Sequence, residues 1–144
     1  MGFNVQQNSI FGDIFKISIP YIENFDRNKF HFSNLFFGAS LNAFKSMLDK
    51  KGYKFLGTSS TGINAFFVKK EYNSIFKSII KDIKEHPAVV REGRDKNGKL
   101  TYENLPRSLI RIKDMEVFDF DENTTKKIND YKNLYSGTWT NYFK

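Results

Sequence analysis

Few residues in this chain have side chains suited to acid–base or metal chemistry. His31 stands among aromatic residues in the segment KFHFSNLFF, and an ordinary histidine pKa near neutrality makes it the candidate general base. The alternative is a packed histidine whose hydrogen bonds are satisfied by the backbone. The carboxylates of Asp119, Asp121 and Glu122 form a candidate cation site, with a solvated acidic strand end as the alternative interpretation. His86 precedes a proline at the end of a predicted helix, which favours a dipole partner.

The composition excludes several classes of site. The chain has 144 residues and no cysteine, which excludes disulfide scaffolds, zinc–cysteine sites, iron–sulfur clusters and thiol catalysis. With two histidines, a metal site built from several histidines is disfavoured. The sequence contains no Gly-rich dinucleotide fingerprint, Walker A sequence or nucleophile elbow. It has no apolar run near the roughly 20 residues of a membrane helix and no visible signal peptide, so we expect a cytoplasmic protein.

The charge balance is basic, with 23 Lys and Arg against 16 Asp and Glu and a net charge of +7. The excess falls between residues 41 and 113. A basic stretch attracts anions, so a module that binds nucleic acid or another polyanion is one alternative function. Most of the positive residues are lysines, which lack the planar fork of arginine. A solvated face is therefore favoured over a nucleic-acid interface.

Hydrophobic periodicity predicts a helix over 41–51, with Ser40 as its N-cap and Gly52 as the residue that ends it. Alternating segments at 53–58 and 63–68, joined by SSTG, predict an antiparallel hairpin. A second helix is predicted over 72–84, because isoleucines recur every four residues. The weaker predictions are a strand within 2–12, a strand over 14–19, an aromatic loop over 21–37, a short helix over 105–112, a strand over 115–120 and an irregular tail from 123.

The order and wording of these segments resemble a known family. The stretches NSIFGD, IPY, NFDRNKFHFSNLFFGASLNAF and KKGYKFLGTSSTGINAFFVKK resemble methyltransferase-like proteins linked to bacterial surface-polysaccharide genes. This family is distantly related to FkbM-type methyltransferases, which belong to the class I S-adenosylmethionine-dependent group. The similarity covers about residues 8–70 and continues loosely towards Met115. The resemblance implies a C-terminal portion whose cofactor-binding N-terminal half is absent, so no residue is carried over as a cofactor ligand.

The resemblance also implies a function and a set of acceptor-side residues. The complete protein would transfer a methyl group from S-adenosylmethionine to a sugar or glycan precursor, and the chain alone would be inactive. The loop 21–38 would line the acceptor pocket, since substrate loops lie beyond the carboxyl ends of the strands in open α/β sheets. Arg27 and Asn34 would bind the acceptor, His31 would be catalytic, and Asn64 is a further binding candidate. A non-catalytic remnant is the remaining alternative.

Together these observations predict an α/β fold. It would be the C-terminal half of a Rossmann-like methyltransferase sheet, ending in an antiparallel hairpin over residues 1–86. Residues 87–144 would form an irregular extension packed on it. Half a sheet has an unpaired edge, so the implied partners are the missing N-terminal half or a second copy bound through that edge.

Overall fold

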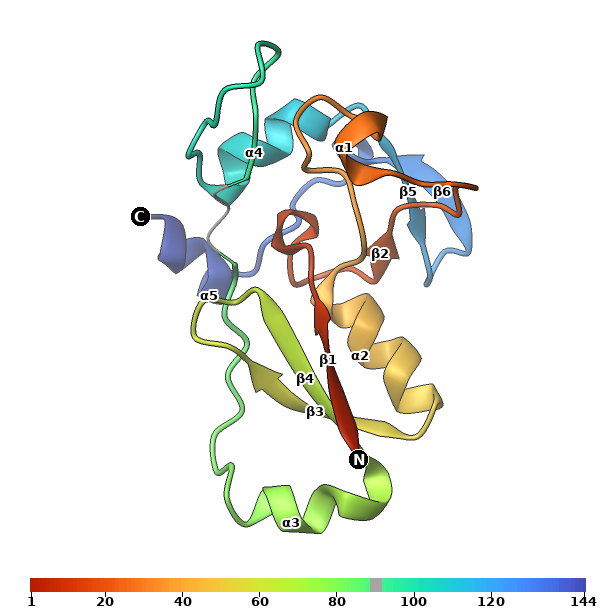
Figure 1. The fold of residues 1–144 in the computed structure, drawn as a ribbon, viewed down its shortest axis with the longest axis vertical. Coiled ribbons are helices and arrows are strands. Elements are labelled where there is room, and N and C mark those ends of the chain that lie inside the picture. Colours follow the sequence, from red (N-terminus) through yellow and green to blue (C-terminus); the bar gives the residue numbers. More distant parts are fainter. Residues whose placement is uncertain (89–91) are drawn as a thin grey trace.

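The computed structural model describes residues 1–88 and 92–144. It contains two small sheets that lie one above the other along the long axis of the molecule (Figure 1). The first sheet has the order β1-β4-β3 and the second the order β2-β5-β6. Every strand pairing among the described residues is antiparallel. The strands are β1 (Gly2–Gln6), β2 (Ile17–Ser18), β3 (Tyr53–Thr58), β4 (Asn64–Lys69), β5 (Glu116–Asp119) and β6 (Thr124–Lys127).

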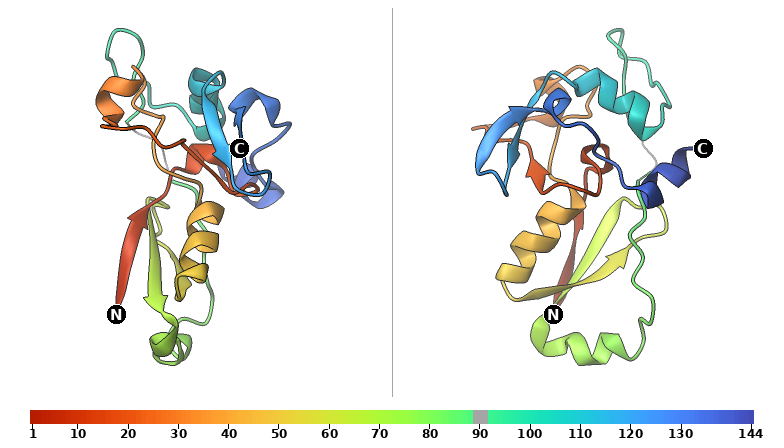
Figure 2. Two further views of the ribbon diagram at one scale, coloured as in Figure 1. Left: turned by 90° about the vertical axis from the view of Figure 1, so that its right-hand side faces the viewer. Right: turned by 180° about the vertical axis from the view of Figure 1, so that it is seen from behind.

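The predicted helix and hairpin in the middle of the chain are confirmed. Helix α2 (Leu41–Lys50) begins at Ser40, whose hydroxyl oxygen accepts the Ala43 N–H at 3.2 Å. It ends before Gly52, whose φ of +88° is a left-handed conformation that favours glycine. The hairpin of β3 and β4 carries a β-bulge between Phe55 and Gly57. Helix α2 covers one face of the first sheet, as the left-hand view of Figure 2 shows.

The second sheet lies beside helix α4 (Leu105–Ile112) and the C-terminal segment (Figure 1). The prediction of a helix over 105–112 is confirmed, whereas β6 and helix α5 (Gly137–Thr140) were not expected in the tail. One hydrophobic cluster joins residues from both halves of the chain, with Phe11 and Phe67 from the first half and Trp139 from the tail. The predicted division into segments 1–86 and 87–144 stays a prediction, and these segments share one core. The remaining helical pieces are α1 (Arg27–Phe30), α3 (Asn73–Lys77) and the 3₁₀ turns η1 (Ser9–Phe11), η2 (Lys70–Tyr72), η3 (Ile128–Asp130) and η4 (Asn141–Phe143).

Two predicted elements are much shorter than expected. The helix predicted over 72–84 is reduced to the five residues of α3. Its isoleucines Ile75, Ile79 and Ile83 are 54, 71 and 52% exposed. A short helix with an unburied apolar face has little to stabilise it, because most helical stability in proteins comes from tertiary packing. The strand predicted over 14–19 is reduced to the two residues of β2, because only Ile17 and Ser18 pair with β5.

The fold is mixed α/β, as expected, but the Rossmann-like order is not confirmed. A parallel sheet needs crossover connections of a dozen or more residues between neighbouring strands. Here β3 and β4 are joined by a short turn, β5 and β6 by another, and β1 pairs antiparallel to β4. The predicted hairpin is correct, whereas the Rossmann-like sheet is not confirmed, because the strand pairings of the described residues are antiparallel. In residues 1–88 and 92–144 no helix is long and apolar enough to cross a membrane.

Candidate ligand cavity

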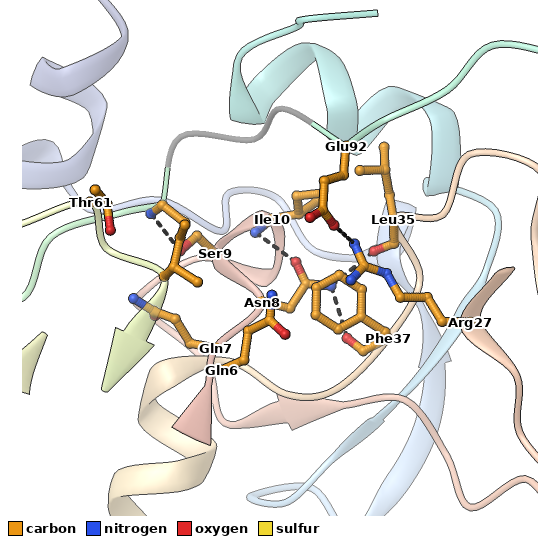
Figure 3. A pocket seen from close by; sticks show the side chains of 12 residues that line it. Gln6, Gln7, Asn8, Ser9, Ile10, Arg27, Leu35, Phe37, Thr61 and Glu92 are labelled. Atoms are coloured by element: carbon orange, nitrogen blue, oxygen red, sulfur yellow. Dashed lines mark hydrogen bonds and ion pairs between the residues drawn. The ribbon is translucent and has the colours of Figure 1, made fainter. Parts of the chain in front are cut away.

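A cavity of about 390 Å³ opens where β1 runs into the turn η1. Its volume lies within the range of small-molecule sites, roughly 300–1,000 Å³. The walls are supplied by the end of β1 with η1, the aromatic loop, the β3–β4 turn, and the two residues Ala88 and Glu92 (Figure 3). The lining consists of residues 6–10, Arg27, Leu35, Phe37, Thr61, Ile63, Ala88 and Glu92.

Two buried amides tie these walls together. The Asn8 side chain donates to the carbonyl oxygens of Leu35 and Phe37, both at 2.9 Å, and accepts the N–H of Ile10 at 3.2 Å. The Gln7 amide nitrogen donates to the carbonyl oxygens of Gly62 at 2.5 Å and His86 at 3.1 Å. Both side chains have a structural role, because each is 2% exposed and its amide N–H groups already donate to backbone carbonyls. The Gln7 carbonyl oxygen is buried and has no hydrogen-bond partner within residues 1–88 and 92–144.

The wall formed by residues 86–88 packs closely on the β3–β4 turn. The Ala88 N–H donates to the Ser9 hydroxyl at 2.8 Å. Gly62 has a φ of +72°, and a Cβ at this position would lie 2.2 Å from the carbonyl carbon and oxygen of Pro87. Only glycine fits such a close approach without moving one chain away from the other. This side of the cavity is therefore fixed by backbone contacts.

Among the described residues of the lining, Arg27 is the one cation, and it has three neighbours that hold it in place. Its Nε donates to the carbonyl oxygen of Asn34 at 2.7 Å, and its Nη2 contacts a carboxylate oxygen of Glu92 at 2.9 Å. The guanidinium carbon lies 3.7 Å from the centre of the Phe37 ring, a cation–π arrangement. Helix α1, which carries Arg27, begins at Asp26, whose carboxylate accepts the N–H of Asn28. The arginine is thus fixed in place, and its charge is balanced at the cavity rim.

His31 lies in the same loop but is not among the lining residues. Its Nδ1 accepts the N–H of Ser33 at 3.2 Å and lies 2.7 Å from the Ser33 hydroxyl oxygen. That hydroxyl oxygen accepts the N–H of Leu35, so we assign its proton to the bond with Nδ1. Burial lowers the pKa of His31. The neutral ring with its proton on Nε2 therefore orders this loop, and the predicted catalytic role of His31 stays a prediction.

The other two predicted binding residues lie in different places. Asn34 adopts a φ of +59° and contacts Arg27 through its backbone carbonyl. Asn64 begins β4 and closes the β3–β4 turn, because its N–H donates to the Ser59 hydroxyl and its carbonyl accepts the Ser59 N–H. The structure therefore brings Arg27, His31 and Asn34 together in one loop and places Asn64 in the turn. Neither asparagine is among the residues that line the cavity.

Sequence reasoning missed the polar run from Gln6 to Ser9, which supplies one wall of the cavity. The signal was present as four consecutive amide and hydroxyl side chains, QQNS, between a short strand and the apolar pair Ile10 and Phe11. Ile10 and Phe11 are 1% and 0% exposed. A polar run next to fully buried residues must find internal hydrogen-bond partners.

The acidic cluster near β5 closes a turn. Asp119 is 3% exposed, and one of its carboxylate oxygens accepts the N–H groups of Asp121 and Glu122 at 2.9 and 3.0 Å. The other oxygen accepts the Tyr131 hydroxyl at 2.6 Å. Burial would raise the pKa of Asp119, but these hydrogen bonds outweigh it and the pKa is lowered. Asp119 is therefore not part of a solvated strand end, and the described part of the chain contains no group of three candidate metal ligands.

Several lysines of the basic stretch have carboxylate partners. Lys54 and Lys70 flank Asp49 at 3.6 and 3.2 Å, and Lys45 forms an ion pair with Glu85. The hydrogen bond from Lys70 lowers the pKa of Asp49. These pairs reduce the positive potential beside α2 and β3.

Comparison of the chain with protein-family models, with curated proteins and with solved structures gives no match. The family resemblance noted in the sequence stays a prediction.

Proposed function

We propose that the cavity binds a neutral, sugar-like acceptor, and that the chain is the acceptor-binding part of a methyltransferase-like protein. The observation that carries the proposal is the arrangement of Arg27, which the aromatic loop holds at the rim of the cavity. The same loop supplies Leu35 and Phe37 to the lining. Fixed polar groups beside apolar side chains are typical of pockets for small organic ligands.

The charge of the cavity supports a neutral ligand. Glu92 lies 2.9 Å from the Arg27 guanidinium, so the two charges that the described residues bring to the lining cancel at the rim. The other polar side chains of the lining are the amides of residues 6–8 and the hydroxyls of Ser9 and Thr61. A phosphorylated or carboxylated ligand would have to compete with Glu92 for Arg27. A sugar could instead place its apolar face against Ile63 and direct hydroxyls towards the exposed Gln6 amide and Thr61 hydroxyl.

The proposal assigns S-adenosylmethionine to a part of the protein outside this chain. A class I cofactor site needs a Gly-rich loop after one parallel strand and a free acid after the next. Within residues 1–88 and 92–144 the lining does not fit that group, because it contains no glycine and its one acid is paired with Arg27. The role proposed for this chain is to bind and orient the acceptor. Arg27 and Asn34 fix the loop that does so, and Asn64 fixes the turn opposite.

The proposal is tested by titrating the full chain with neutral hexoses and N-acetylhexosamines, followed by calorimetry or NMR shifts. A matched series of sugar phosphates and uronic acids is titrated in parallel. We expect binding of at least one neutral sugar and at least tenfold weaker binding of its charged counterpart. Failure of every neutral sugar to bind would refute the proposal, and tighter binding of the phosphates would favour the polyanion alternative.

A filled cavity provides the site control. Ile63 lines the cavity and is 39% exposed, so Ile63→Trp can place a bulky ring there. Ile110 is 64% exposed on α4 and does not line the cavity, so Ile110→Trp is the matched control. We expect Ile63→Trp to weaken sugar binding at least tenfold and Ile110→Trp to leave it unchanged. Equal affinities for the two variants would place the ligand elsewhere.

A further inference from the structure

Strand β1 forms an open edge of the first sheet. It pairs with β4 on one side, and none of the described strands pairs with its other side. The left-hand view of Figure 2 shows β1 at the margin of the molecule, away from α2. Open edges present unpaired N–H and C=O groups that favour pairing with another chain. The outer edge of β1 therefore favours pairing with a further strand.

The hydrogen-bond pattern identifies which backbone groups face outwards. The Lys69 N–H donates to the carbonyl oxygen of Met1 at 2.9 Å, and the Gln7 N–H donates to the carbonyl oxygen of Ile63 at 3.1 Å. In an antiparallel pair, alternate residues of a strand bond to the same neighbour. The odd-numbered residues of β1 therefore bond to β4. The backbone groups of Gly2, Asn4 and Gln6 point away from the sheet.

The other strand edges of the described structure carry protection that β1 lacks. The outer side of β3 is covered at Thr58, whose N–H donates to the carbonyl oxygen of Lys84 at 2.9 Å. In the second sheet, β6 ends in Lys126 and Lys127, and lysines on an edge strand oppose strand pairing. The β1 sequence GFNVQ has no charge and no proline. It is the edge best suited to accept a further strand.

We infer that β1 pairs antiparallel with β1 of a second copy of this chain, about a two-fold axis through Asn4. In this register Asn4 faces its own counterpart, and Gly2 faces Gln6 of the other copy. All three outward-facing residues then form hydrogen-bonded pairs, so each of their backbone N–H and C=O groups has a partner in the other copy. A shift of one residue would place outward-facing residues opposite inward-facing ones. The strand is therefore complementary to itself in this register.

The side chains agree with this arrangement. Phe3 and Val5 lie on the face of the sheet that also carries Phe67 and Tyr53, and Phe3 is 39% exposed. In the inferred dimer Phe3 lies opposite Val5 of the other copy, an aromatic–aliphatic cross-strand pair that stabilises antiparallel sheets. The contact involves one five-residue strand from each copy. An interface of this size belongs to the weak, concentration-dependent class.

The test uses the absence of cysteine from the chain. Asn4→Cys places two sulfhydryl groups opposite each other across the two-fold axis, where the Cα separation of about 5.5 Å permits a disulfide. Gln6→Cys is the matched control, because Gln6 faces Gly2 of the other copy. We expect oxidation to convert Asn4→Cys largely to a covalent dimer and Gln6→Cys at least fivefold less. Equal or reversed cross-linking would overturn the register.

Sedimentation of the unmodified full chain tests the association itself. We expect a monomer–dimer equilibrium that shifts to dimer as the concentration rises. Asn4→Pro removes an N–H that points away from β4, so it should weaken the dimer at least tenfold while circular dichroism shows a folded chain. Gln6→Lys serves as a second variant, with a charge on the edge in place of a proline. A monomer at every concentration, or a dimer unaffected by both variants, would overturn the inference.

Discussion

The C-terminal tail is expected to be essential for the fold, and Trp139 provides the test. Its side chain is 1% exposed, and its indole N–H donates to the carbonyl oxygen of Glu85 at 2.8 Å. Replacing a buried tryptophan by alanine costs about 3–5 kcal/mol, and orphaning a carbonyl adds about 1–3 kcal/mol. Domains have a total free energy of unfolding of about 5–15 kcal/mol. Trp139→Ala should therefore lower the free energy of unfolding by about 4–8 kcal/mol, which is enough to unfold a domain at the low end of that range.

Trp139→Phe gives a graded measurement, because it retains a ring but removes the donor to Glu85. We expect a loss of about 1–3 kcal/mol, which lowers the melting temperature by roughly 2–4 °C for each kcal/mol in a chain of this size. Urea unfolding followed by far-ultraviolet circular dichroism measures it without using tryptophan fluorescence. Tyr21→Ala is the control, since Tyr21 is 94% exposed. Both Trp139 variants within 0.5 kcal/mol of the unmodified chain would refute the assignment of the tail to the core.

Three further changes test individual contacts. Gly12→Ala should cost about 2–4 kcal/mol, because its φ is +78° and a Cβ would lie 1.9 Å from a facing carbonyl oxygen. Gly98→Ala is its control, with a φ of +79° and open space around it, and should cost about 1–2 kcal/mol in urea unfolding. The lowered pKa of Asp119 stabilises the fold above the pKa of the unfolded carboxyl, and this stabilisation is lost as the pH falls through the folded value. Tyr131→Phe removes a donor to that carboxylate, so its stability deficit should be largest at pH 7 and shrink towards pH 3; a pH-independent deficit in melting temperature would contradict this. Ile79→Lys should change the free energy of unfolding by less than 0.5 kcal/mol, since Ile79 is 71% exposed, and a larger loss would mean that this segment is packed.

Local sequence signals predicted those elements whose ends and faces agree with their packing. The helix α2 has a serine cap, an apolar stripe and a terminal glycine, and each has its expected role in the structure. The segment from Ile75 to Ile83 has an equally regular apolar stripe, yet only a short helix forms. The difference is tertiary, since α2 packs on a sheet and the isoleucines of the other segment remain exposed. Periodicity alone cannot show whether a partner surface exists.

The elements of the tail were not predicted, because they form through tertiary contacts and have no local sequence pattern. Strand β6 has the sequence TTKK, which offers no apolar alternation, and it forms because it pairs with β5. The core residues Leu134 and Tyr135 lie in irregular backbone and Trp139 lies in the four-residue helix α5, so none of them belongs to a repeating pattern. Long-range bonds hold them in place: the Tyr135 hydroxyl donates to the Ile10 carbonyl, 125 residues away, and the Trp139 indole N–H donates to the Glu85 carbonyl, 54 residues away. Such contacts leave no local signature.

The candidate site could be predicted only in part. The aromatic loop was expected to line a pocket, and Arg27 does lie in the lining. The opposite wall was missed because Gln7 and Asn8 act through hydrogen bonds to segments 27–79 residues away in sequence. His31 was selected for its ordinary pKa, whereas the structure gives its Nδ1 two local partners from Ser33. Candidate residues chosen by type need a structure to show which of their atoms are free.

The cavity and the fold depend on the same hydrogen bonds, which links ligand binding to stability. Asn8 connects the N-terminal segment to the aromatic loop, and Gln7 connects it to the β3–β4 turn and the chain at His86. A ligand that fills the cavity contacts all of these segments and cannot bind once they separate. Binding must then stabilise the fold, and a ligand at a hundredfold excess over Kd adds about 2.7 kcal/mol to the free energy of unfolding. The melting temperature rises as a result. Saturable binding of a sugar with an unchanged melting temperature would show that the ligand lies outside this cavity.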